Sequence, residues 1–240
     1  MSITQNVKRA KADYDEVYKA GYNEAALAHW NAITNNGKRT IWNDNSPFSY
    51  TDYSTVEFPK PIVLTGDISK LFRLYQGVKF PRKSDIDMTG VTKASSTFSF
   101  IYSTGQRVIP DYGIPALDIY DNTYQSSSSV SEIEILRCHE NTQFTKTFDT
   151  CTNLIELRIE GTIGQNGFDI HWSIALSKAS IQSILGALAV HPTVANPTIT
   201  LPKAAVDKAY ETSPGANDGS TSLEWQVACE ERSAWTKALA

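Results

Sequence analysis

Three segments in the middle of the chain share one spacing of apolar positions, apolar-x-x-apolar-x-apolar. They are Ile114–Ile119, Val130–Ile135 and Leu154–Ile159, and Ile86–Met88 is a shorter fourth candidate. The last two apolar residues of each segment are separated by one polar residue, as in a β-strand with one buried face. We therefore expect each segment to contribute one strand to a common sheet.

The distances between these segments indicate a repeated unit. The three full segments start 16 and then 24 residues apart, on either side of the 20–29-residue period of a leucine-rich repeat. Because one such unit cannot bury its own apolar face, the units stack and their strands form a parallel sheet. The sequence thus predicts an α/β protein with a short, irregular leucine-rich-repeat solenoid over residues 62–173. Phe98, Phe144 and Phe148 are expected to fill its interior opposite the strands.

The N-terminal residues 1–37 follow a heptad pattern typical of a helix. Its apolar positions, spaced 4, 3, 4 and 3 residues apart, are Ile3, Val7, Ala10, Tyr14 and Val17. Asn36-Gly37 ends the pattern with residues suited to a helix C-terminus. The helix either mediates self-association or docking, or lies on its own domain. Residues 38–61 are aromatic-rich without a clean period, and we expect a capping or linker segment there.

The C-terminal residues 174–240 change to a helical period. Ser177 is a candidate N-cap for an amphipathic helix that reaches Leu188. A short strand is expected at Thr198–Leu201, followed by a helix after Pro202 and a last helix at about Ser222–Arg232. Because an open repeat stack needs a terminal cap, we interpret this region as a helical C-terminal cap.

Several of these motifs also resemble a known family. The run Phe148-x-x-Cys151-x-x-Leu154-x-x-Leu157-x-Ile159 resembles the BspA-like leucine-rich repeat. Further motifs resemble the two ends of leucine-rich-repeat proteins found among tail and virion-surface genes of gut phages and prophages; they include Tyr18–Asn23, Trp30–Ile33, Asn36–Thr40, Phe168–Trp172, Ser180–Leu188 and Trp235–Ala240. The resemblance implies a structural or host-contact component of a virion, and it brings no catalytic residues.

Composition and charge narrow the function classes. The net charge is −4, which gives no basic footprint for nucleic acid. No stretch approaches the roughly 18–20 apolar residues of a membrane span, and the N-terminus lacks the pattern of a secretory signal. The 3 cysteines are widely spaced and odd in number, which favours small buried side chains over a disulfide framework. We expect neither nucleic-acid binding nor membrane insertion.

Motifs that carry chemistry are not found in the sequence. The 4 histidines are far apart, and Cys138 and His139 on one strand point to opposite faces, which suits no zinc site. Gly161-x-x-Gly164-x-x-Gly167 precedes no helix, so it is not a dinucleotide fingerprint. Asp85 and Asp87 flank Ile86 and leave a paired-carboxylate glycosidase as an alternative. We expect no enzyme activity, no catalytic residue, no cofactor and no metal.

The outward side chains of the expected strands predict an acidic face. In register, one column holds Asp118, Glu134 and Arg158, a second holds Ala116, Glu132 and Glu156, and a third holds Tyr120, Leu136 and Glu160. This face either contacts a basic partner or polar glycan, or serves solubility and prevents edge pairing. Tyrosines offer a second candidate surface, on which we expect one to three exposed rings among Tyr102, Tyr112, Tyr120 and Tyr124. The partner-binding candidates are Asp118, Tyr120, Tyr124, Glu132, Glu134, Glu156 and Arg158.

Three functions are compatible with these patterns. The first is a virion protein, assembled in the host cytoplasm, that oligomerises through the N-terminal helix, conceivably as a trimer. It would contact other virion proteins and a host surface protein or glycan. The second is a bacterial or prophage-encoded protein-interaction module. The third is a glycan-degrading tail enzyme.

Overall fold

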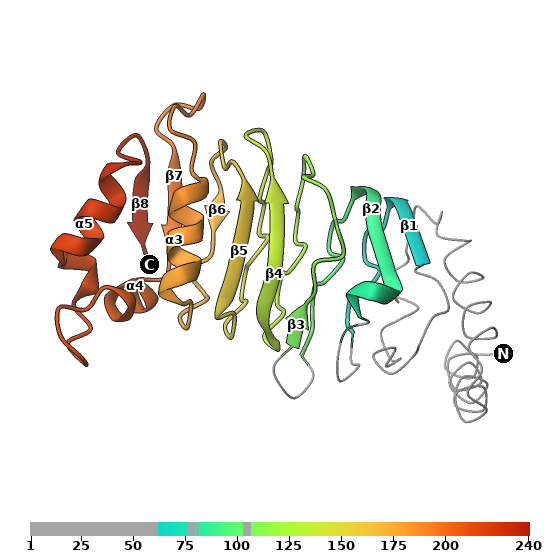
Figure 1. The fold of residues 1–240 in the computed structure, drawn as a ribbon, viewed down its shortest axis with the longest axis horizontal. Helices are drawn as coiled ribbons and strands as arrows, with labels where there is room; N and C mark the ends of the chain where they lie inside the picture. The colour runs from blue at the N-terminus through green and yellow to red at the C-terminus, as the bar shows by residue number, and fades with distance from the viewer. Residues whose placement is uncertain (1–61, 76–79, 81, 103–106) are drawn as a thin grey trace.

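Parallel strands stack along the long axis of the molecule and form one of its walls (Figure 1). The computed structural model describes residues 62–75, 80, 82–102 and 107–240. The predicted segments 1–37 and 38–61, with the heptad residues Ile3, Val7, Ala10, Tyr14 and Val17, lie outside the described residues. We call the first wall the strand wall; it consists of β1 (Ile62–Asp67), β2 (Ile86–Lys93), β3 (Arg107–Ile109), β4 (Val130–Cys138) and β5 (Glu156–Gly161).

All strand pairs of this wall are parallel, as the sequence predicts. β1 pairs with β2, and β4 lies between β3 and β5. In register, Ile109 lies beside Ile133 and Ile133 beside Leu157, so equivalent positions are 24 residues apart in both steps. Apolar side chains at these positions point inward and are buried, as alternation on a half-buried sheet requires.

The expected strand at Ile114–Ile119 is wrong. Within that segment only Ile119 forms an isolated parallel bridge, to Gln143, and the strand beside β4 is the earlier β3. Pro115 has no N–H to donate to a strand ladder, and β3 is three residues long, too short for a recognisable alternation. The apparent 16-residue step thus came from comparing positions that are not equivalent.

The opposite side of the molecule consists of four turn-rich return segments, Ile68–Tyr75, Ala94–Ile101, Tyr120–Ser127 and Phe144–Cys151, which we call the return wall. Adjacent segments are joined by backbone hydrogen bonds. The N–H of Lys70 donates to Ser95 O at 3.0 Å, that of Ser96 to Asp121 O at 3.0 Å, and that of Asn122 to Thr145 O at 3.0 Å. The same chain path therefore recurs in each segment.

Backbone angles repeat with the same period. Lys70, Ser96, Asn122 and Lys146 all have positive φ, between 52° and 65°, and are separated by 26, 26 and 24 residues. A positive φ is costly for residues with a Cβ, by about 1–3 kcal/mol each. Its recurrence at one position of each segment shows that the hydrogen bonds between segments offset this cost.

A column of buried hydroxyl groups adds to the return wall. The Oγ1 of Thr97 donates to Ile68 O at 3.0 Å, that of Thr123 to Ala94 O at 3.1 Å, and that of Thr147 to Tyr120 O at 2.7 Å. All three threonines are completely buried. Each hydroxyl thus links one segment to the one before it, in an interior where an unpaired polar group would be costly.

Aromatic rings stack behind this column. The ring centroids of Phe72 and Phe98 are 5.5 Å apart, those of Phe98 and Tyr124 5.7 Å, and those of Tyr124 and Phe148 5.6 Å, with interplanar angles of 7–8°. The rings of Tyr120 and Phe144 form a second stacked pair. The prediction that Phe98, Phe144 and Phe148 fill the interior is confirmed, because all three are buried.

The helix α3 (Lys178–Ala187) covers the outer edge of β5. The N–H of Leu157 donates to Ser180 Oγ and the N–H of Ile159 to Ser183 Oγ, both at 2.8 Å. Serine hydroxyls of a helix thereby satisfy a strand edge that would otherwise invite pairing with another chain. The predicted N-cap is confirmed, since Ser177 Oγ accepts from Ser180 N at 3.1 Å.

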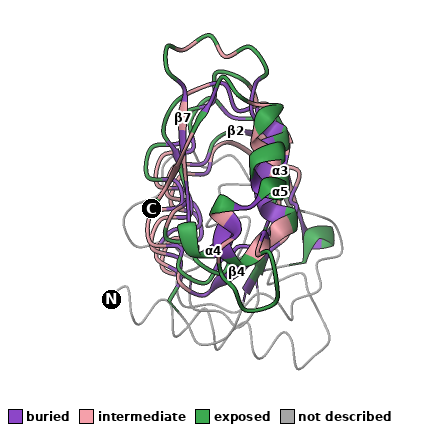
Figure 2. Cartoon of the chain, turned by 90° about the vertical axis from the view of Figure 1, so that its left-hand side faces the viewer, coloured by how far each residue is buried: buried purple, intermediate pink, exposed green. Residues whose placement is uncertain are grey.

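The C-terminal region carries a third parallel sheet, opposite α3. It has the order β6 (Phe168–Asp169), β7 (Thr198–Leu201) and β8 (Thr236–Leu239), and α4 (Lys203–Ala209) and α5 (Leu223–Glu230) complete this end. The view along the long axis places α3 and α5 on the side of β4 and β7 on the other side (Figure 2). The strand predicted at Thr198–Leu201 is confirmed, whereas β8 was not predicted.

The described part of the chain is therefore a mixed α/β protein with short parallel sheets and three helices. This confirms the predicted class in its coarser form. Within the described ranges, none of the helices is both long enough and apolar enough to cross a membrane.

Candidate functional site: a polar groove in the return wall

The hydrogen-bond ladder of the return wall stops after its fourth segment. The N–H groups of Asn122 and Tyr124 donate to Thr145 O and Thr147 O. Among the residues that the structure describes, the equivalent N–H groups of Lys146 and Phe148 have no hydrogen-bond acceptor. The next passage of the chain, β6, bonds onward to β7 instead. The wall is thus open between Phe144–Cys151 and β6.

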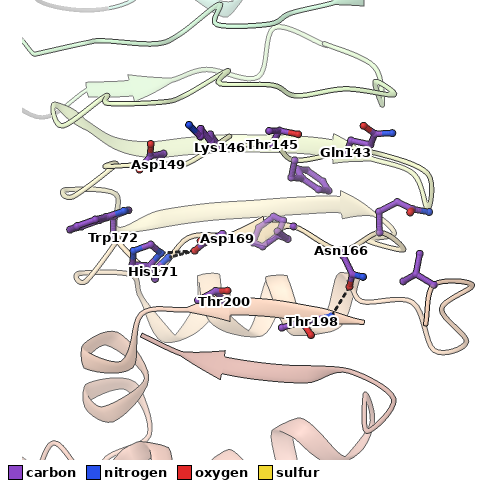
Figure 3. Close-up of a pocket in the computed structure, with 15 residues that line it drawn as sticks. Gln143, Thr145, Lys146, Asp149, Asn166, Asp169, His171, Trp172, Thr198 and Thr200 are labelled. Atoms are coloured by element: carbon purple, nitrogen blue, oxygen red, sulfur yellow. Dashed lines mark hydrogen bonds and ion pairs between the residues drawn. The ribbon is translucent and has the colours of Figure 1, made fainter. Parts of the chain in front are cut away.

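A groove of about 720 Å³ occupies this opening, and we call it the return groove (Figure 3). The buried rings of Phe144 and Phe168 lie at its base, with centroids 5.0 Å apart. The fourth return segment forms one side of the groove, and β6 with the residues after it forms the other. Its polar lining consists of Gln143, Thr145, Lys146, Asp149, Gln165, Asn166, Asp169, His171, Thr198 and Thr200.

One end of the groove carries an exposed aromatic side chain. Trp172 is 44% exposed, and its ring lies 4.8 Å from that of His171. The Nδ1 of His171 is 2.7 Å from Asp169 Oδ1, and the backbone N–H of His171 donates to the same oxygen at 3.1 Å. Figure 3 shows Asp149 at this end too, across from His171. A short loop after β6 thus places an indole, an imidazole and two carboxylates together.

The opposite end of the groove is lined by amides. Asn166 Oδ1 accepts from Thr198 N at 2.8 Å, which leaves the Asn166 amide NH2 available. Gln143 lies at the same end on the other side (Figure 3). Gln165 is held by a bond from its Nε2 to Glu140 O. The groove therefore offers hydrogen-bond donors and acceptors along its length, fixed by local bonds.

Metal chemistry has no support in this region. Within the described ranges, no group of three or more His, Cys, Asp or Glu side chains could hold a metal ion. Burial raises the pKa of the Cys138 and Cys151 thiols to about 12, so both remain protonated and poorly nucleophilic. Asp85 is bound by Arg82, and Asp87 accepts from Thr89 N. The arrangement suits recognition of a ligand by hydrogen bonds and stacking.

The predicted acidic face is found in part. Glu132 and Glu156 lie beside each other on β4 and β5, as expected. Glu156 accepts from the hydroxyls of Ser177 and Ser180. These two glutamates and Arg158 border a shallow depression on the strand wall beside α3. This surface is open and polar and lacks an aromatic platform.

The remaining column of that face is wrong. Asp118 lies outside the strands, and its carboxylate pairs with His139 at 3.0 Å. Glu134 accepts from Asp111 N at 2.8 Å, and Arg158 pairs with Glu160 at 3.1 Å. The register shifts between Ile133 and Leu136, so a continuous alternation from the sequence assigns these positions wrongly.

The expected aromatic surface is also corrected. Tyr120 and Tyr124 are buried, as is Tyr112, whereas Tyr102 is 57% exposed. The hydroxyl of Tyr120 donates to Arg137 O at 2.9 Å, and Tyr124 belongs to the ring stack of the core. Burial raises the pKa of both phenols. Neither side chain is available for a partner in this conformation.

A buried ion pair braces the strand wall next to this core. Asp111 accepts from both terminal nitrogens of Arg137, at 2.6 and 2.9 Å, and from Gly113 N at 2.9 Å. The Arg137 guanidinium holds the pKa of Asp111 far below its usual range. Arg137 also pairs with Glu160 at 3.2 Å, which connects the loop after β3 to β4 and β5.

Sequence reasoning missed the return groove. A usable signal existed in the pairs Thr97-Phe98, Thr123-Tyr124 and Thr147-Phe148, which mark successive return segments. The next equivalent pair is Ser173-Ile174, without an aromatic residue. Such an irregularity indicates where the wall changes, and Trp172 directly precedes it.

Comparisons of the chain with models of protein families, with curated proteins and with solved structures found no match. The proposals below therefore stand on the residues and their geometry, together with the sequence resemblance.

Proposed function

We propose that the chain is a non-enzymatic binding protein with a short leucine-rich-repeat solenoid, and that it works at the surface of a bacteriophage particle. Equivalent positions recur every 24–26 residues along the return wall, inside the 20–29-residue range of leucine-rich repeats. Hydrogen bonds and stacked rings join each unit to its neighbour, which is how a repeat stack buries a continuous core. The virion location rests on the resemblance of its motifs to phage proteins.

The return groove is the observation that carries the binding function. It is a polar concavity with an exposed indole, on a scaffold held by backbone and side-chain hydrogen bonds. Preorganised polar groups around a concave surface are typical of binding sites. The described residues around it hold no reactive thiol and no metal-binding group. Recognition of a host surface glycan or protein is therefore the proposed activity.

Self-association through residues 1–37 and contact with other virion proteins belong to this proposal. The heptad positions Ile3, Val7, Ala10, Tyr14 and Val17 are the expected seam, and residues 174–240 are the proposed cap. Light scattering of the full chain at micromolar concentration tests the seam. We expect an oligomer that a Val7→Asp, Val17→Asp variant dissociates. A monomeric full chain would contradict this part.

The main experiment asks where the protein is and what it touches. An antibody against the chain is used on purified particles, and the labelled full chain is used on host cells. We expect signal on intact particles and saturable binding to cells. Absence from particles, together with saturable binding to one bacterial protein, would favour the protein-interaction module. Absence of both kinds of binding would refute the proposed function.

A glycan-degrading activity is the second candidate, because Asp149 and Asp169 line the same groove. Paired carboxylates are the usual catalytic groups of glycosidases. The test is release of reducing ends from host polysaccharide by the full chain, with an Asp149→Asn, Asp169→Asn variant as control. Release that the variant abolishes would replace the non-enzymatic proposal.

A further inference from the structure

We propose that the return groove binds an uncharged hexose oligosaccharide, with one sugar ring stacked on Trp172 and sugar hydroxyls bound by Asp149 and Asp169. This inference names the ligand class of the groove, and it rests on the proposed binding function. The argument has four steps, which concern the aromatic platform, the hydrogen-bonding groups, the charge and the competing occupant.

The platform is the one large aromatic side chain of the groove that reaches solvent. Phe144 and Phe168 are buried at the base, whereas Trp172 is 44% exposed at one end. Its contact with the ring of His171 restricts the orientation of the indole. Indole rings provide a flat apolar surface with low conformational entropy to lose on binding. The apolar C–H face of a hexose matches such a surface.

The hydrogen-bonding groups of the groove match neighbouring hydroxyls. Carboxylates accept two hydrogen bonds through a planar fork, and amides both donate and accept. Figure 3 shows Asp149 near Trp172, Asp169 in the middle, and Asn166 with Gln143 at the far end. The unpaired N–H groups of the fourth return segment add donors to the same opening. This sequence of groups along an elongated groove suits two or three linked sugars.

The charge of the groove favours a ligand without acidic groups. Its lining holds two carboxylates and one ammonium group, those of Asp149, Asp169 and Lys146. An anionic saccharide would meet like charges at the centre of the groove, which is unfavourable at close range. A neutral sugar keeps both carboxylates as acceptors. We therefore expect neutral oligosaccharides to bind better than uronic or sialic acids.

An extended peptide is the competing occupant. A peptide that adds to a sheet edge gains its affinity from a run of backbone hydrogen bonds. β6 is two residues long, so it offers too short an edge for such a run. The exposed indole and the amide-lined end also provide specificity that an added strand would not use. The observations thus favour the sugar.

The test is titration calorimetry of the full chain with maltotriose, cellotriose, mannotriose and chitotriose, and with a uronic acid trimer as the anionic probe. We expect at least one neutral trimer to bind. Trp172→Ala should weaken it at least tenfold, Trp172→Phe less, and Asp169→Asn by about three- to tenfold. Tyr102→Ala is the matched control, because Tyr102 is an exposed aromatic residue outside the groove, and it should bind normally. Circular dichroism establishes that each variant is folded.

The outcomes separate this inference from the proposed function. If no neutral trimer binds at 10-fold excess over millimolar affinity, roughly the weakest useful range, the sugar assignment is overturned. Binding unaffected by Trp172→Ala, tighter binding of the uronic acid, or capture of a peptide that competes at Trp172 also overturns it. If host-cell binding persists in folded Trp172→Ala, the groove assignment fails and the binding function stands. If sugar binds but neither particles nor cells do, the reverse holds.

Discussion

Replacing Thr123 by Val tests whether the buried hydroxyl column holds adjacent units together. The two side chains have nearly the same shape and both are β-branched, so the change removes the hydroxyl and leaves the packing close to intact. Thr123 is completely buried, and its Oγ1 donates to Ala94 O at 3.1 Å across two return segments. The variant therefore isolates one hydrogen bond between neighbouring units.

The expected cost is about 1 kcal/mol. A net intramolecular hydrogen bond contributes about 0.5–1.5 kcal/mol, and a buried acceptor left wholly unpaired costs more. Ala94 O keeps a second bond from Thr97 N at 3.1 Å, so the larger penalty does not apply. For a chain of this size, about 1 kcal/mol corresponds to a drop of roughly 2–4 °C in Tm.

The assay is urea unfolding of the full chain followed by circular dichroism. We expect a lower midpoint with an unchanged dependence of the unfolding free energy on urea concentration. Thr145→Val is the matched control, because Thr145 is exposed, and it should leave the midpoint unchanged. A Thr123→Val protein as stable as the original would refute the reasoning, since apolar packing alone would then account for the cohesion of the return wall.

Three further substitutions test other parts of the fold by the same assay. Gly161→Ala should destabilise by roughly 3 kcal/mol or more, because φ is +113° and an added Cβ would lie 1.8 Å from Cys138 O; a loss under about 1 kcal/mol would contradict this. Asp111→Asn should cost about 1–3 kcal/mol at pH 7 by weakening the Arg137 pair. Because the folded-state pKa of Asp111 is lowered from 3.8, its contribution is present above about pH 4 and is lost on acidification, so the variant and original should converge at low pH. Ser183→Ala should cost about 1–2 kcal/mol by leaving a β5 N–H without its acceptor, and an unchanged midpoint would show that water replaces it.

The sequence predicted the elements whose evidence is local. β4, β5 and α3 each contain enough apolar positions at one period to be recognised, and the Ser177 cap lies directly before its helix. β3 has three residues, and a pattern that short cannot be separated from chance. The strand prediction at Ile114 failed for this reason, because a neighbouring apolar triplet with a longer match was taken in its place.

The candidate site depended on relations that no local pattern contains. The burial of Tyr120 and Tyr124 follows from the segments stacked on either side of them. The return groove exists because β6 pairs with β7, thirty residues further along the chain, and not with the segment before it. Trp172 is therefore at an opening that only strand pairing creates.

The amino-acid sequence by itself determined the repeated units of this protein, because side-chain periodicity records which face of each segment is buried. Its acidic net charge and the absence of reactive motifs likewise followed from the sequence alone. The tertiary structure decided the register between units, which tyrosines are covered, and where the hydrogen-bond ladder stops. These depend on backbone pairing between residues some 24–30 positions apart, and such pairing satisfies N–H and C=O groups that are the same in every residue but proline.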